Sequence, residues 1–108
     1  MGVEVKTTEP GIGITKPKKG QKCTMHYRGK LTDGTEFDSS YKRNKPFTFT
    51  LGVGQVIRGW DEGVTQMTKG ECATLTMTPD FGYGARGAGR DIPPNASLVF
   101  DVELIDFK

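Results

Sequence analysis

Few residues in this chain could carry out acid–base, nucleophilic or metal chemistry, and their spacing matches no catalytic or metal-binding pattern. The chain has one histidine, His26, and two cysteines, Cys23 and Cys72, that lie 49 residues apart. Zinc sites draw several Cys or His ligands from closely spaced pairs, so no metal site is expected. Asp61 and Glu62 are adjacent, whereas an acid–base pair should converge on one bond. We expect these two carboxylates to stabilise the positive end of a helix dipole, and His26 to be structural.

Aromatic side chains are the more informative group. Eight of them recur along the whole chain: Tyr27, Phe37, Phe47, Phe49, Trp60, Phe81, Tyr83 and Phe100. They could form the hydrophobic core, although eight is a large number for a core of this size. They could equally line a mostly apolar concave site with a few convergent polar groups. Composition alone leaves both interpretations open.

A glycine-rich segment suggests a nucleotide site, but its context argues against one. Gly52 and Gly54 follow a predicted strand and precede a predicted helix. The third glycine of a dinucleotide-binding loop should stand at position 57, which is Ile57, and no β-α-β unit surrounds it. Nucleotide binding is therefore not expected. The basic run 16–22 lies in a Pro/Gly turn, and we interpret it as a solvated loop.

The elements that must position these residues follow from hydrophobic periodicity. Alternation with a period of two predicts strands over 3–6, 21–31, 47–51, 73–78 and 98–104, and residues 36–39 are expected to form a short strand or extended piece. Ile57, Trp60, Val64 and Met67 are spaced as one face of a helix, which Gly70 is expected to end. Residues 80–95 form a long Gly/Pro-rich loop of the kind that is often functional. The pattern predicts an α+β fold, with an antiparallel sheet and one short helix packed on it.

Length and charge limit the classes of protein further. The 108 residues correspond to one domain, and a formal net charge of +2 does not favour electrostatic nucleic-acid binding. No apolar run approaches the roughly 20 residues of a membrane-spanning helix, and the opening segment has no signal-peptide pattern. We therefore expect a cytoplasmic monomer with reduced cysteines and neither nucleic-acid nor membrane partners.

Long motifs then point to a family. The segments HYRGKLTDGTEFDSS (26–40), NKPFTFTLGVGQVIRGWDEGV (44–64), PDFGYG (79–84) and IPPNASLVFDVEL (92–104), together with the MGV…PG opening, resemble the tacrolimus- and rapamycin-binding FKBP immunophilins. The resemblance covers essentially the whole chain, 1–108, as one isomerase domain of the small cytosolic type. It implies a five-stranded antiparallel sheet curled around one short helix. It also implies peptidyl-prolyl cis–trans isomerase activity without a metal or cofactor.

The resemblance also implies a site. Its catalytic residues would be Tyr27, Phe37, Asp38, Trp60, Tyr83 and Phe100. The wider substrate- and drug-binding set would add Arg43, Phe47, Gln55, Val56, Ile57 and Ile92. Trp60 would form the floor of the pocket, and Arg43 would hold Asp38. The N–H of Ile57 and the hydroxyl of Tyr83 would donate hydrogen bonds to carbonyl groups of the bound X-Pro segment or drug. Phe49 and Phe81 would belong to the core or to loop packing.

The implied partners are X-Pro peptide segments, tacrolimus and rapamycin, with calcineurin or TOR kinase reached through the drug complex. The loop 86–91 reads RGAGRD and is more polar than in familiar members, so calcineurin inhibition by a drug complex is the less certain expectation. An alternative role is that of a partner-docking immunophilin module that regulates a channel, a receptor or a signalling protein, with incidental isomerase activity. A basic oligonucleotide-binding barrel is a third possibility, and the near-neutral charge speaks against it.

Overall fold

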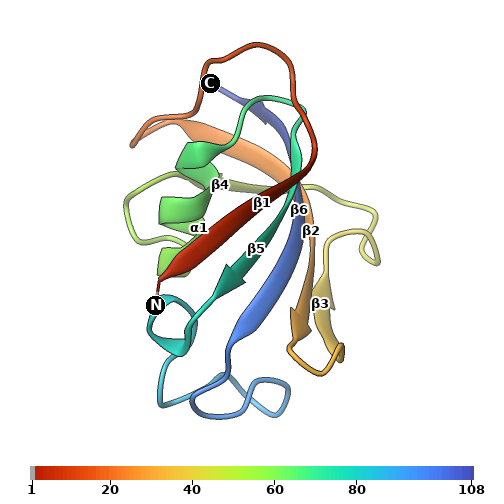
Figure 1. Cartoon of the computed structure of the whole chain (residues 1–108), viewed down its shortest axis with the longest axis vertical. Helices are drawn as coiled ribbons and strands as arrows, with labels where there is room; N and C mark the ends of the chain where they lie inside the picture. The colour runs from red at the N-terminus through yellow and green to blue at the C-terminus, as the bar shows by residue number, and fades with distance from the viewer. Residues whose placement is uncertain (1) are drawn as a thin grey trace.

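The computed structural model describes residues 2–108 (Figure 1). Its strands and helices, in chain order, are β1 (Val3–Glu9), β2 (Lys22–Leu31), β3 (Glu36–Ser39), β4 (Phe47–Thr50), α1 (Arg58–Gly63), the 3₁₀ turn η1 (Val64–Gln66), β5 (Cys72–Met77), the 3₁₀ turn η2 (Pro79–Phe81) and β6 (Leu98–Phe107). No helix within residues 2–108 is both long and apolar enough to cross a membrane.

The strands form one antiparallel sheet in the order β1-β5-β6-β2-β3, and β4 also pairs with β2. The predicted fold class is confirmed, although the sheet has six strands rather than five. The two short strands share one side of β2, because β3 pairs with the stretch 28–30 and β4 with the stretch 22–25. Between them the charged segment 40–46 leaves the sheet. The number five came from the family resemblance, and the separate strands predicted over 36–39 and 47–51 are β3 and β4.

Helix α1 is shorter than the sequence pattern predicts. The apolar stripe extends to Met67, yet the α-helix ends at Gly63 and continues only as η1. Glycine and β-branched residues are weak helix formers, and Gly63 is followed by Val64 and Thr65. Helix α1 lies against one face of the sheet (Figure 1). The approach is close, since a β-carbon at Gly59 would meet the side chain of Met77 on β5.

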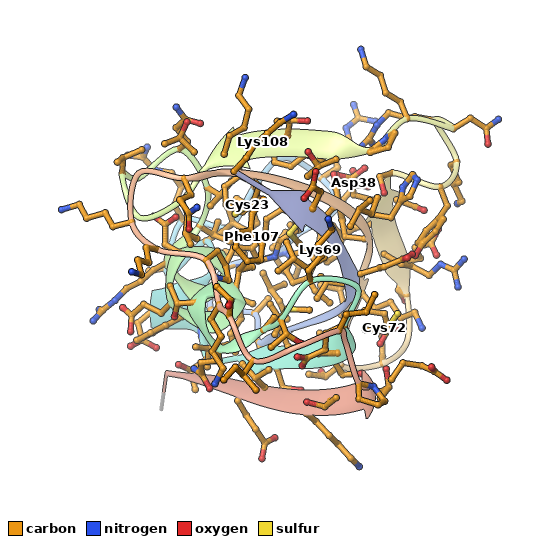
Figure 2. The ribbon with its side chains drawn as sticks, turned by 90° about the horizontal axis from the view of Figure 1, so that it is seen from above. Cys23, Asp38, Lys69, Cys72, Phe107 and Lys108 are labelled. Atoms are coloured by element: carbon orange, nitrogen blue, oxygen red, sulfur yellow. The ribbon has the colours of Figure 1, made fainter. Side chains whose placement is uncertain are left out.

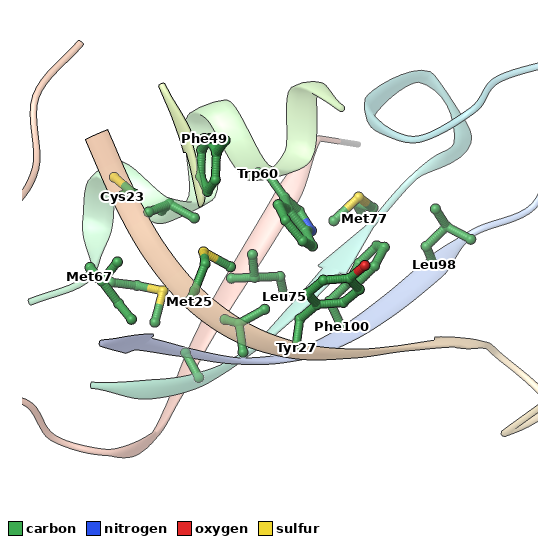
Figure 3. Close-up of a cluster of buried hydrophobic side chains, with 14 of the residues drawn as sticks. Cys23, Met25, Tyr27, Phe49, Trp60, Met67, Leu75, Met77, Leu98 and Phe100 are labelled. Atoms are coloured by element: carbon green, nitrogen blue, oxygen red, sulfur yellow. The ribbon is translucent and has the colours of Figure 1, made fainter. Parts of the chain in front are cut away.

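The core fills the space between α1 and the concave side of the sheet (Figure 3). Alternate residues of the central strands supply it, among them Cys23, Met25 and Tyr27 of β2. Leu75 of β5 and Leu104 of β6 are fully buried in the same cluster. This is the period-two pattern predicted from the sequence, and it leaves the opposite faces of these strands to solvent.

Candidate functional site

A cavity of about 370 Å³ opens between α1 and the sheet. Every major element of that region contributes a wall: β2, β3, β4, the segment before α1, α1 itself, the loop after η2, and β6. The lining residues are Tyr27, Phe37, Asp38, Phe47, Gln55, Val56, Ile57, Trp60, Tyr83 and Phe100. Six of these are aromatic and only Asp38 is charged, so the cavity suits a compact apolar group with a few polar atoms.

Trp60 lies at the centre of the aromatic group (Figure 3). Its ring centroid is 4.8 Å from that of Tyr27, 5.2 Å from that of Phe100 and 5.8 Å from that of Phe47. All three contacts are edge-to-face, with interplanar angles between 71° and 81°. Such contacts stabilise the arrangement beyond the area they bury. The rings therefore form a rigid wall and floor rather than a loose cluster.

The indole nitrogen of Trp60 is buried without a hydrogen-bond partner among the described residues. Buried donors are normally satisfied, and Trp60 as a whole is only 5% exposed. The cavity is therefore floored by a side chain whose polar end is already desolvated.

A hydrogen-bonded trio closes one side of the cavity. The hydroxyl of Tyr27 donates to Oδ2 of Asp38 at 2.6 Å, and Nη1 of Arg43 donates to Oδ1 of Asp38 at 2.6 Å. Nη2 of Arg43 donates to the Tyr27 oxygen at 2.8 Å, and the backbone N–H of Ser39 donates to Oδ1 of Asp38 at 2.8 Å. Both carboxylate oxygens of Asp38 are thus engaged by the protein.

The trio shifts the pKa values of its members. Burial raises the pKa of Asp38, but the hydrogen bonds from Tyr27, Arg43 and the Ser39 amide outweigh it, so the net pKa is lowered. The pKa of Tyr27 is raised, first by burial and then by its hydrogen bond to Asp38. Near neutral pH the site therefore holds a carboxylate beside a protonated phenol.

Two further donors border the cavity. Ile57 is the N-cap residue of α1, with φ −60° and ψ 152°, and an N-cap N–H has no partner within the helix. Its carbonyl accepts from the N–H groups of Trp60 and Asp61 at 3.0 and 3.2 Å, which fixes its orientation. Burial, followed by the charge of Asp38, raises the pKa of Tyr83, so its hydroxyl is also a donor near neutral pH.

Comparison with known proteins identifies the family. A model described as FKBP-type peptidyl-prolyl cis-trans isomerase matches residues 13–105. The chain is 60% identical over 105 residues to "Peptidyl-prolyl cis-trans isomerase Fkbp12" of Drosophila melanogaster, covering 97% of each chain. It is 61% identical over 108 residues to "FK506-binding protein 1" of Dictyostelium discoideum, covering all of both chains. It is 57% identical over 105 residues to "FK506-binding protein 1A" of Aspergillus fumigatus, covering 97% of this chain and 94% of the relative.

The chain belongs to the FKBP-type peptidyl-prolyl cis–trans isomerases. The predicted family and isomerase activity are confirmed by these matches. Of the twelve residues assigned to the site from the sequence, this isomerase brings ten together around the cavity. The other two are Arg43, which touches the cavity only through Asp38 and Tyr27, and Ile92. Ile92 is 5% exposed and packs in the core, where its N–H and carbonyl pair with Ala88.

Two residues that position the walls of the cavity were not identified from the sequence as doing so. A β-carbon on Gly29 would lie 2.7 Å from Phe100 and 2.8 Å from Phe37, so these two cavity rings require a glycine behind them. The sequence signal was a glycine inside a strand, which often marks such a close approach. Asp61 accepts hydrogen bonds from the N–H groups of Gly52 and Gly54 at 2.8 and 3.0 Å.

The structure therefore gives Asp61 a positioning role, and the dipole role expected from the sequence stays a prediction. Its carboxylate holds the turn that leads to Gln55, Val56 and Ile57 of this isomerase. The signal was the glycine-rich turn at Gly52–Gly54, because the backbone N–H groups of a tight turn need acceptors and a nearby carboxylate can supply them.

The side chains outside the cavity occupy structural positions. His26 stacks on Tyr41 with ring centroids 4.5 Å apart, and its Nδ1 lies 2.7 Å from Oγ of Ser40. Phe49 and Phe81 are buried in the core. Cys23 is fully buried, and burial, with a smaller contribution from the charge of Asp61, raises the pKa of its thiol to about 11.

Proposed function

We propose that this isomerase holds the X-Pro segment of a peptide in the aromatic cavity and lowers the barrier to rotation about its amide bond. The observation that carries the proposal is the wall of edge-to-face rings around Trp60, with a single charged residue at its border. A proline ring is compact and apolar, and such a wall accepts it through shape and apolar contact.

The chemistry requires no nucleophile. The barrier to amide rotation is about 18–20 kcal/mol, because resonance gives the C–N bond double-bond character. The planar, charge-separated amide is stabilised by water, whereas the twisted transition state is less polar. An apolar cavity therefore favours the twisted state relative to the planar one, and a shape that fits the twisted amide adds differential binding.

Individual residues have distinct roles in this proposal. The N–H of Ile57 and the hydroxyl of Tyr83 donate to carbonyl groups on either side of the proline. Trp60, Phe37 and Phe100 hold the proline ring. Asp38 is not a general base, because both of its oxygens already accept hydrogen bonds within the protein. Asp38 instead supplies a fixed negative charge and a further acceptor at the cavity border.

We infer that the same cavity binds tacrolimus and rapamycin. Two of the relatives are named as binding FK506, which is tacrolimus, and the family match supports the extension to this chain. The complex of this protein with the drug would then bind calcineurin or TOR kinase. The loop 86–91 carries Arg86, Arg90 and Asp91, all exposed, and its charge is expected to weaken a calcineurin contact more than drug binding itself.

We also infer that residues 1–108 act as one isomerase domain in the cytoplasm. The family match over 13–105 and a single continuous sheet support the first part. The two cysteines of the described chain, Cys23 and Cys72, are both free, which agrees with a reducing compartment.

The test measures the cis-to-trans rate of a short peptide containing Leu-Pro, with and without the protein and again with tacrolimus. The uncatalysed step takes tens of seconds or longer, so acceleration is easily resolved. We expect the protein to catalyse the isomerisation and tacrolimus to abolish this catalysis. The variant Phe37→Ala should lose most of both the catalysis and the tacrolimus binding. Drug binding without catalysis would instead support the partner-docking role. If the protein showed no catalysis and no drug binding, the assignment of the site would be refuted.

A further inference from the structure

One end of the molecule combines exposed isoleucines with a cluster of lysines. The sheet is antiparallel, so the end of β1, the start of β2, the start of β5 and the end of β6 all lie at the same end. The loop 10–21 crosses this end beside the last residues of the chain (Figures 1 and 2). We name this region the basic end. It is formed by the loop 10–21, Lys22 at the start of β2, the turn 67–71 and residues 106–108.

The isoleucines of the basic end are held outward. Ile12 is 78% exposed and Ile14 is 91% exposed, the highest values among the exposed large hydrophobic residues. The N–H of Ile12 donates to the carbonyl of Lys69 at 2.7 Å, and Pro17 of the same loop is buried. Gly11 is pressed so closely against the turn 68–71 that a β-carbon there would lie 2.4 Å from Oγ1 of Thr68. A backbone fixed at these points prevents the isoleucines from folding back onto the core.

Positive charge surrounds these two side chains. Six exposed lysines belong to the basic end: Lys16, Lys18, Lys19, Lys22, Lys69 and Lys108. Lys22 and Lys108 are brought together by reciprocal backbone hydrogen bonds of 2.9 and 3.0 Å. Lys69 pairs with Asp106 at 3.3 Å, and the other five form no ion pair within residues 2–108.

Three carboxylates at this end, Glu9, Glu71 and Asp106, oppose the six lysines, so the charge is reduced by about half and stays positive. Glu71 is buried and accepts hydrogen bonds from Thr7 and Thr68, while Asp106 is engaged by Lys69. Glu9, at the end of β1, is the exposed carboxylate of these turns. A nearly neutral chain therefore presents a locally cationic end with two apolar side chains at its surface.

We propose that the basic end docks on an anionic phospholipid surface, with Ile12 and Ile14 entering the interface and the lysines contacting the headgroups. Apolar side chains flanked by lysines are the combination that binds peripheral proteins to acidic membranes. The contact is peripheral, and it departs from the expectation of no membrane partner, which rested on the lack of a spanning segment.

The charge and position of this end fit a bilayer surface. Its exposed lysines are complementary to anionic headgroups, and it lies at one end of a molecule that is 37 Å long and 25 × 21 Å across. Insertion of two projecting side chains into a fluid interface needs no complementary groove and leaves the isomerase cavity free, because the loop 10–21 contributes no residue to it.

The test is sedimentation of the full chain with lipid vesicles at low salt. One set contains phosphatidylcholine and phosphatidylserine at about three to one, and the other contains phosphatidylcholine alone. The wild-type protein should sediment with the anionic vesicles only. Added salt should release it from them, because salt shortens the screening length and weakens the attraction between the lysines and the headgroups. The double variant Ile12→Ser/Ile14→Ser should bind at least about tenfold more weakly, because the apolar contribution is lost.

A second pair of variants separates local charge from net charge. Lys16→Gln/Lys18→Gln should also bind about tenfold or more weakly. The matched control Lys6→Gln/Lys45→Gln removes two exposed lysines elsewhere and should stay within about twofold of wild type. All variants should keep wild-type isomerase activity, which shows that each is folded.

Three results would overturn the proposal. The first is no binding of the wild type to anionic vesicles. The second is unchanged binding of the isoleucine variant, which would reduce the contact to nonspecific charge attraction. The third is binding to polyglutamate that is as strong as binding to the anionic vesicles and is unchanged in the isoleucine variant, which would point to an acidic protein partner instead.

Discussion

The substitution Gly29→Ala tests whether the aromatic wall of the cavity is set from behind by the sheet. The added β-carbon would lie 2.7 Å from Cε1 of Phe100, 2.8 Å from Cζ of Phe37 and 2.9 Å from Cε1 of Phe37. Ordinary van der Waals contacts between carbon atoms are about 3.5–4.0 Å. One or both rings must therefore move by roughly 0.7–1 Å. Both rings line the cavity, so any movement that relieves the clash changes the shape of the site.

The magnitude follows from the cost of overpacking. Inserting one methyl group into a packed region typically costs about 1–3 kcal/mol. The displaced rings must move back, or the bound group must adapt to them, when a proline ring or tacrolimus occupies the cavity. A penalty of about 1.4 kcal/mol corresponds to tenfold, so we expect kcat/KM and tacrolimus affinity each to fall by about tenfold or more. The free energy of unfolding should fall by about 1–3 kcal/mol.

The measurements are the peptide isomerisation rate, denaturant unfolding and tacrolimus titration followed by the fluorescence of Trp60, the only tryptophan in the chain. The matched control is Gly63→Ala, which adds the same methyl group 3.2 Å from Leu75, a residue that does not line the cavity. It should keep kcat/KM and drug affinity within about twofold of wild type. If Gly29→Ala retains wild-type kcat/KM and affinity, the reasoning is refuted, whatever its effect on stability.

The remaining predictions concern the groups around the cavity and the thiols. Tyr27→Phe removes the hydroxyl between Asp38 and the guanidinium, and it should cost about 1 kcal/mol of stability by denaturant unfolding. The pKa of Asp38 is lower in the folded protein than in the unfolded chain, where it is about 3.9. The ionised carboxylate therefore stabilises the fold above that pH, and this contribution is lost as the pH falls through the folded pKa. The stability of Asp38→Asn at acid pH should accordingly depend less steeply on pH than that of wild type. Asp61→Asn offers one acceptor where two N–H groups need partners, and its Tm should fall by several degrees in calorimetry. In a titration with a thiol reagent, Cys72 should react slowly, and Cys23 should react only after unfolding, because both pKa values are raised and Cys23 is fully buried; rapid reaction of both thiols would contradict this.

Much of the fold was predictable because its strands alternate regularly. The alternation of Cys23, Met25 and Tyr27 with polar neighbours placed the buried face of β2 correctly. The position of α1 followed from a change of period at Ile57 and Trp60. Such patterns report burial directly, since one face of each element must leave water.

The details that sequence reasoning missed depend on contacts between distant segments. The two strands over 36–39 and 47–51 were predicted separately, but their pairing with the same side of β2 depends on how residues 40–46 leave the sheet, which no local pattern records. The support of Phe37 and Phe100 by Gly29 likewise needs three strands in register.

The site was predictable mainly through its family motifs. Eight aromatic residues were equally consistent with a core and with a cavity, and in the structure they are divided between both. Phe49 and Phe81 are buried in the core, whereas Phe47 and Tyr83 line the cavity. Periodicity cannot separate these cases, because a wall of a cavity and a core residue use the same face of a strand.

The order of strands in the sheet also constrains how the protein is made. Strand β6 is the last to be synthesised, yet it lies in the middle of the sheet, between β5 and β2. At ribosomal rates of about 5–20 residues per second, synthesis of residues 1–97 takes roughly 5–20 s, so β1 waits about that long for the strand that joins the two halves of the sheet. Until β6 is made, β5 has one unpaired edge and β2 has another, and apolar side chains such as Met25 and Leu75 have no complete core to enter. The complete sheet can therefore form only after residues 98–107 have been made.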